Sequence, residues 1–187
     1  DDARSTNPPS NPQLLDALAL DFVKHQYDIK RVIRNICNSY AYRLEATVLP
    51  TNGDDLQSFA RFYPRRLQAE VLLDGISQVL AVPTKFAGVP AGTRAIDLPD
   101  ENVPAHFLTV FGRPARTSAC ECERIDAPSL AQALEFVNSK EIQGKLTAEK
   151  GYIQQLSMNK KSHGDNVNDI FLRVFARLPR AEEQKVA

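Results

Sequence analysis

The sequence predicts a mostly α-helical fold, an irregular multi-helix domain with long loops rich in proline and glycine. Three observations support this fold class. Apolar residues recur at intervals of three and four in several segments, which is typical of amphipathic helices. No segment alternates convincingly between apolar and polar residues as a half-buried strand would. The 12 prolines and eight glycines divide the 187 residues into short segments, and we expect these to form a single domain over residues 1–187.

Two helices are expected after a polar, proline-rich lead-in over residues 1–12. Pro12 suits the first turn of the first helix, which extends to about His25. Asp28 is the expected N-cap of the second helix. The apolar stripe of that helix consists of Ile29, Val32, Ile33, Ile36, Cys37 and Tyr40. The short connection predicts an antiparallel helical hairpin.

The middle of the chain alternates between loops and helices. We expect a polar loop over residues 45–58 with a turn at residues 52–54, and then a short helix that ends before Pro64. That short helix would carry Leu56, Phe59 and Phe62. A longer helix should begin near Arg66. Its expected inner face is Leu67, Val71, Leu72, Ile76, Val79 and Leu80. Residues 82–102 are predicted to form an irregular contact loop, followed by a short helix within residues 103–111.

The last third of the sequence predicts further helices. Pro128 or Ser129 should open one helix, and shorter helices should follow it through Ile142 and Leu156. A final amphipathic helix spans residues 167–175 and stops before Pro179.

Composition and motifs exclude several function classes. The formal net charge is zero, which argues against nucleic-acid binding, and no apolar run approaches the ~20 residues that span a membrane. The sequence contains no Gly-x-Ser-x-Gly, no Cys-x-x-Cys-His and no phosphate-binding glycine loop.

Residues 112–124 concentrate unusual side chains. Arginines flank two acids here, and a second basic cluster lies at residues 61–66. The candidate binding residues are Arg65, Arg66, Arg113, Arg116, Glu121, Glu123 and Arg124. Because arginine can hold a carboxylate through two parallel hydrogen bonds, we favour an internal network that joins loops. The alternative is that these arginines bind an anionic ligand.

Cys120 and Cys122 lie in the same segment. They could form a disulfide with each other, pair with Cys37, or bind a metal with His106 and a further ligand. Inert thiols that fix a loop are the remaining interpretation. Cys37 is expected to act as a small hydrophobic residue on its helix.

Five ordered blocks resemble a known family. They run from Asn7 to Ala19, from Arg61 to Asp74, from Gly88 to Ala95, from Phe111 to Arg116 and from Ser129 to Leu134. With the cysteine segment, they resemble planctomycete-specific domain one, a domain of unknown function, over nearly the whole chain.

The resemblance implies an extracytoplasmic setting. Domains of this family form the C-terminal part of large exported proteins. Those proteins often carry a cytochrome-c-like region and a second planctomycete-specific domain upstream, so haem c would lie outside this chain. A sulfatase-like partner is often encoded nearby. The resemblance also implies that the chain is the C-terminal part of a larger family domain whose N-terminal helices are missing. In an exported protein, a disulfide that involves Cys120 or Cys122 becomes the leading interpretation.

The sequence therefore predicts a non-enzymatic interaction or scaffold domain with no cofactor of its own. One alternative is a carbohydrate-processing subunit or another enzyme that acts on an anionic substrate. The other is a metal or redox module at Cys120 and Cys122.

Overall fold

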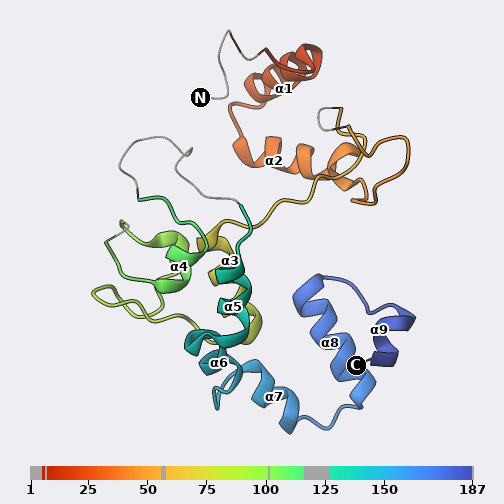
Figure 1. Cartoon of the computed structure of the whole chain (residues 1–187). Coiled ribbons are helices and arrows are strands. Elements are labelled where there is room, and N and C mark those ends of the chain that lie inside the picture. The colour runs from red at the N-terminus through yellow and green to blue at the C-terminus, as the bar shows by residue number, and fades with distance from the viewer. Residues whose placement is uncertain (1–5, 7, 56–57, 101, 116–126, 187) are drawn as a thin grey trace. The chain divides into compact units, whose positions relative to one another are not determined.

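The computed structural model describes residue 6 and residues 8–55, 58–100, 102–115 and 127–186. Every regular element in these ranges is a helix, and none of them contains a strand (Figure 1). The prediction of a mostly α-helical fold is therefore confirmed. The chain divides into two compact units, unit 1 (residues 1–66) and unit 2 (residues 67–187), which we describe separately.

Unit 1 begins with the two predicted helices, α1 (Pro12–Lys24) and α2 (Ile29–Asn38). The side chain of Asp28 caps α2 by accepting a hydrogen bond from the backbone N–H of Arg31 (3.1 Å). The two helices are in contact, and Asp21 of α1 accepts hydrogen bonds from Arg31 Nε (3.3 Å) and Asn35 Nδ2 (3.1 Å) of α2. The hydrogen bond from Arg31 lowers the pKa of the Asp21 carboxyl.

The rest of unit 1 is largely irregular. The 3₁₀ helix η1 (Ala41–Arg43) follows α2, and the predicted turn over residues 52–54 is present. The short helix predicted through Phe59 and Phe62 is absent, because Phe59 has a left-handed backbone (φ 54°). Instead, the Phe62 N–H bonds the carbonyl oxygen of Glu45 (3.0 Å), which ties this segment to the one after η1. Leu56 lies outside the described residues.

The core of unit 2 forms where α3 (Ala69–Leu80) meets the 3₁₀ helix η2 (Ala95–Asp97) and the predicted short helix α4 (His106–Val110) (Figure 1). Its buried members are Ala69, Leu73, Ala95, Leu98, Val103, Phe107, Leu108, Phe111 and Ile142. The rings of Phe107 and Phe111 stack with 4.3 Å between centroids. The predicted inner face of α3 needs correction: Leu67 and Val71 are exposed, and Leu73 is fully buried.

The loop over residues 82–102 is irregular, as predicted, but parts of it belong to the core. Ala95 and Leu98 are buried, and Phe86 and Val89 pack against the core residues. Asp74 of α3 fixes this loop by accepting hydrogen bonds from the N–H groups of Ala95 (2.7 Å) and Ile96 (3.1 Å). The loop is therefore held by α3 on one side and exposed on the other.

Five further helices lie within the described residues of unit 2: α5 (Leu130–Asn138), α6 (Lys140–Leu146), α7 (Tyr152–Met158), α8 (His163–Phe175) and α9 (Ala181–Val186). Ser129 opens α5 with a capping box, as its position predicts. Arg173 of α8 donates hydrogen bonds to the carbonyl oxygens of Val79 (2.6 Å) and Gln78 (2.9 Å), and so caps the C-terminal end of α3. No helix within the described ranges is both long and apolar enough to cross a membrane.

Candidate functional site

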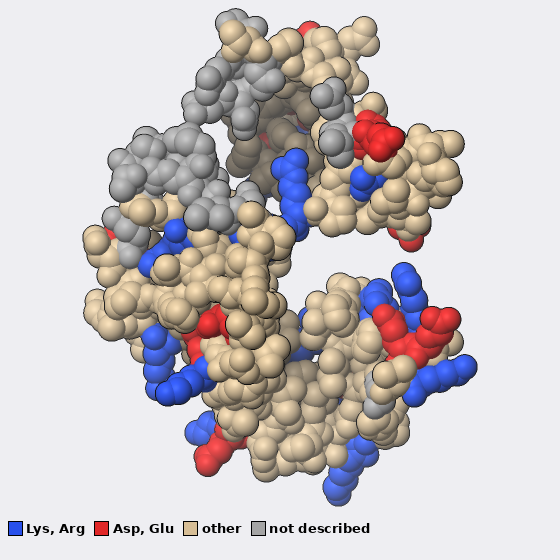
Figure 2. Space-filling view, in the orientation of Figure 1, with Lys and Arg blue, Asp and Glu red and all other residues tan. Residues whose placement is uncertain are grey.

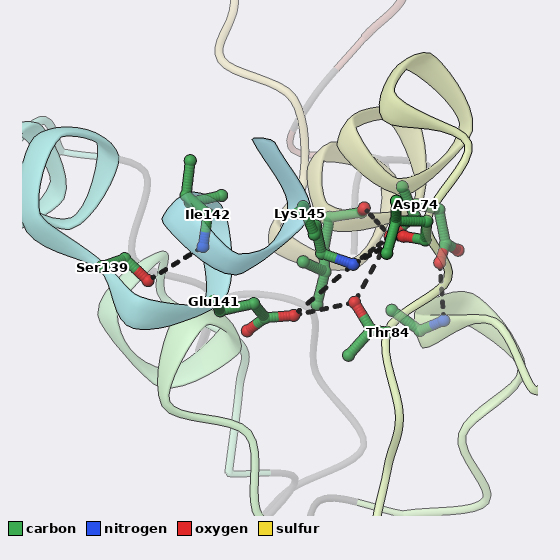
Figure 3. Close-up of polar contacts among 10 residues, drawn as sticks. Asp74, Thr84, Ser139, Glu141, Ile142 and Lys145 are labelled. Atoms are coloured by element: carbon green, nitrogen blue, oxygen red, sulfur yellow. Dashed lines mark hydrogen bonds and ion pairs between the residues drawn. The ribbon is translucent and has the colours of Figure 1, made fainter. Parts of the chain in front are cut away.

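A buried lysine lies at the centre of a polar cluster between α3, α6 and the segment over residues 82–84 (Figure 3). The side chain of Lys145 is 4% exposed. Its Nζ donates hydrogen bonds to Ser77 Oγ (3.1 Å) and to the carbonyl oxygen of Val82 (2.8 Å), and lies 3.9 Å from Glu141 Oε1. Burial lowers the pKa of Lys145, while the charge of Glu141 acts in the opposite direction.

Two hydroxyl groups connect this lysine to the carboxylate (Figure 3). Ser77 Oγ donates to the carbonyl oxygen of Leu73 (2.9 Å) and lies 3.3 Å from Thr84 Oγ1. Thr84 donates to Glu141 Oε1 (2.8 Å). Lys145 Nζ is the donor to Ser77 Oγ, and only in its unprotonated form can the amine accept the serine proton. The same hydrogen bonds also connect α3, α6 and the loop between them.

A cavity of about 370 Å³ lies beside this cluster. It is lined by Asp74, Ser77, Gln78, Ala81, Pro83, Thr84, Gly92, Thr93 and Arg94. The charged groups on its wall already have partners within the protein. Asp74 accepts the two backbone hydrogen bonds from η2, and Arg94 donates two hydrogen bonds to Asp97 (2.8 and 3.0 Å). The carboxylate of Asp74 and the guanidinium of Arg94 therefore stabilise the fold through these hydrogen bonds.

The structure describes only some of the arginines that the sequence singles out. Arg65 is exposed and Arg66 is half-buried in unit 1. Arg113 of unit 2 is half-buried and donates to the carbonyl oxygen of Val103 (3.0 Å), so it holds the segment that precedes α4. Arg116, Glu121, Glu123 and Arg124 lie outside the described residues, and the network of arginines and acids stays a prediction.

The cysteine site is likewise only partly described. Cys120 and Cys122 lie outside the described residues. Cys37 is a free, exposed cysteine on the apolar stripe of α2. His106 Nε2 lies 3.4 Å from Glu135 Oε2. Among the described side chains, no three His, Cys, Asp or Glu residues are grouped closely enough to hold a metal ion.

An apolar surface on unit 1 is the second feature of functional interest. No described residue of this unit is buried. On α2, Ile29 is 59% exposed, Ile33 54% and Ile36 42%. Other large apolar side chains of the unit are exposed as well, namely Leu14, Leu15, Leu20, Val23, Tyr27, Tyr40, Tyr42, Val48, Leu49, Phe59 and Phe62. Exposed apolar side chains in such number, in a unit with no buried residue among those described, are typical of an interaction surface.

The charged side chains lie in separate groups on the surface. Figure 2 shows broad areas of neutral side chains between separate groups of basic and acidic residues.

The sequence did not reveal the lysine cluster. Lys145 follows Ile142 by one helical turn, a position that faces the core in α6, but a lysine at such a position is usually exposed to solvent. Ser77 and Thr84 carry no motif. Their grouping depends on the packing of α3 against α6, which the sequence pattern does not specify.

The sequence matches the model of a known protein family. The family described as "PSD1: Protein of unknown function (DUF1553)" matches residues 1–187. Neither the curated proteins nor the solved structures include a significant match. The match covers the whole sequence and agrees with the family that the five sequence blocks resemble, so this chain belongs to the PSD1 family, whose function is unknown.

Proposed function

We propose that this chain is a non-enzymatic interaction domain that binds its partner through the apolar surface of unit 1. One observation carries the proposal: α1 and α2 are well-formed helices, yet no described residue of their unit is buried. In a helix that packs within its own domain, the apolar stripe faces a core. On α2 that stripe faces outward, where a binding partner would remove it from water.

The chemistry of unit 2 supports a binding role over a catalytic one. Asp74, Arg94 and Lys145 are all engaged in contacts that hold helices and loops together. An enzyme would instead direct such groups toward a substrate.

The proposal is tested with the double variant Ile33→Asp/Ile36→Asp. Both side chains are exposed, so the thermal midpoint should change by no more than a few degrees. The fluorescence of an apolar dye such as bis-ANS should fall strongly, because its binding surface has been removed. Leu178→Asp is the matched control, since Leu178 is equally exposed but lies in unit 2. A large loss of thermal stability in the double variant would show that the surface is covered within the chain and would refute the proposal.

The setting of this domain is part of the proposal. The family resemblance supports an exported multidomain protein with haem c in upstream domains and a sulfatase-like partner. In that setting the segment with Cys120 and Cys122 would carry a disulfide, and Arg65, Arg66 and Arg113 would organise loops. Localisation of the full-length protein by cell fractionation tests this part directly.

Acyl transfer at Ser77 is a second candidate function, favoured by the hydroxyl group that lies 3.1 Å from Lys145 Nζ at the wall of the cavity. In this reaction, the unprotonated form of Lys145 would take the proton of Ser77 Oγ as that oxygen attacks the carbonyl carbon of an ester. The tetrahedral adduct would then break its bond to the ester alkoxide, which leaves as an alcohol with the proton returned by Lys145. The test is labelling by a fluorophosphonate, read by intact mass, with Ser77→Ala as the control. If the wild type gains no adduct, this candidate is excluded and the interaction domain is unaffected.

A further inference from the structure

The polar and apolar side chains of α2 are sharply segregated. At about 100° per residue, Ile29, Val32, Ile33, Ile36 and Cys37 fall within one arc of about 140°. Every charged residue of the helix is basic, and all of them lie outside this arc: Lys30, Arg31 and Arg34. A helix with an apolar face, a cationic face and low net hydrophobicity is typical of segments that lie in a membrane interface.

The three basic residues of α2 differ in their contacts within the protein. Arg31 is held by Asp21 of α1. Lys30 and Arg34 are exposed, and within the described part of the chain they form no ion pair. They lie next to the apolar arc, from which their long side chains can reach outward to anionic groups while the isoleucines stay buried.

Exposed tyrosines flank both ends of α2 in the sequence. Tyr27, just before the helix, is 66% exposed, and Tyr40, just after it, is 83% exposed. Tyrosine is enriched where membrane meets water, because its ring is apolar and its hydroxyl group is polar.

We propose that α2 docks on the surface of a bilayer that contains anionic lipid, with its isoleucines at the boundary between headgroups and acyl chains and with Lys30 and Arg34 against the headgroups. This inference rests on the proposed function, because it names the partner of the same surface. Charge complementarity favours a lipid surface, since a purely cationic helix face matches anionic headgroups.

The size of the α2 face, taken without the rest of the unit 1 surface, favours lipid over a folded protein. A helix of 10 residues is about 15 Å long, and its single face offers only part of the roughly 800 Å² per partner that a stable protein interface buries. A bilayer accommodates a short convex face without a matching groove.

The experiment is flotation of the full chain with two kinds of vesicle, pure phosphatidylcholine and an equal mixture of phosphatidylcholine and phosphatidylglycerol. We expect binding to the mixed vesicles that weakens strongly at about 0.5 M salt, and little binding to the neutral ones. Lys30→Ala and Arg34→Ala should each weaken binding about fivefold. Ile33→Asp/Ile36→Asp should abolish it, and Leu178→Asp should leave it unchanged.

The outcomes separate this inference from the proposed function. If the wild type does not bind the mixed vesicles, or if the isoleucine variant binds as well as the wild type, membrane docking by α2 is refuted. If docking is refuted while the isoleucine variant keeps its thermal stability and loses dye binding, the interaction domain stands and its partner is a protein. If Ile33→Asp/Ile36→Asp strongly lowers the thermal midpoint, both proposals are refuted.

Discussion

Removing the carboxylate of Asp74 should detach the loop over residues 82–102 from α3. Asp74 accepts backbone hydrogen bonds from Ala95 (2.7 Å) and Ile96 (3.1 Å), and Ala95 is itself part of the core. Hydrogen bonds to charged groups are worth about 1.5–3 kcal/mol each, and Asp74 is half-buried, so Asp74→Ala should cost about 2–4 kcal/mol. For a unit of this size, that loss lowers the thermal midpoint by about 10 °C.

The matched control is Asp97→Ala in the same loop. Asp97 pairs with Arg94, but the two side chains are 53% and 65% exposed, so the thermal midpoint should change by no more than about 2 °C. Asp74→Asn retains one acceptor oxygen and should fall between the two. Thermal unfolding followed by circular dichroism measures all three variants. If Asp74→Ala is no less stable than Asp97→Ala, the loop is not held by Asp74 and the reasoning fails.

Three further predictions concern titration and thiols. The hydrogen bond from Arg177 and the backbone N–H of Arg180 lower the pKa of Glu183 from 4.5 to about 2. The stabilisation of α9 should therefore be complete above pH 4.5 and disappear as the pH falls toward 2. The protection factors of the α9 amides should fall over that range in the wild type and stay constant in Glu183→Gln. Because burial lowers the pKa of Lys145 below 10.5, the stability of the wild type relative to Lys145→Met should rise as the pH increases toward 10.5; a constant difference in urea unfolding would contradict this. Thiol counting with intact mass should find one reactive cysteine, Cys37, and a mass about two daltons below the reduced value, whereas three reactive thiols would exclude a disulfide.

Local sequence signals predicted the helices more reliably than the faces they bury. The caps Asp28 and Ser129 fix where α2 and α5 begin, because their side chains bond backbone groups a few residues away. The inner face of α3 was placed wrongly, since Leu67 and Val71 are apolar but exposed, while Leu73 is buried. Burial depends on where those elements pack, and the pattern of one helix does not contain that information. Helix α9 was missed because its six residues carry almost no apolar periodicity.

The candidate sites show the same limit. The apolar arc of α2 follows directly from the sequence, but its exposure does not, because an amphipathic stripe normally predicts a buried face. The cluster around Lys145 depends on residues 77, 82, 84 and 141, which come together only when α3 packs against α6. Short-range patterns therefore placed an apolar arc on α2 but revealed neither its exposure nor the buried cluster of unit 2.

The absence of buried residues in the described part of unit 1 has a calorimetric consequence. The heat capacity of unfolding comes mainly from apolar surface that becomes hydrated, and unit 1 has little such surface left to expose. Its helices depend on caps such as Asn11 and Asp28 and on the contacts of Asp21, each a local interaction. Their helicity should therefore decline gradually on heating, while the cooperative peak comes from unit 2. If the calorimetric enthalpy of unfolding is divided by all 187 residues, the resulting value per residue will be lower than the true value for unit 2.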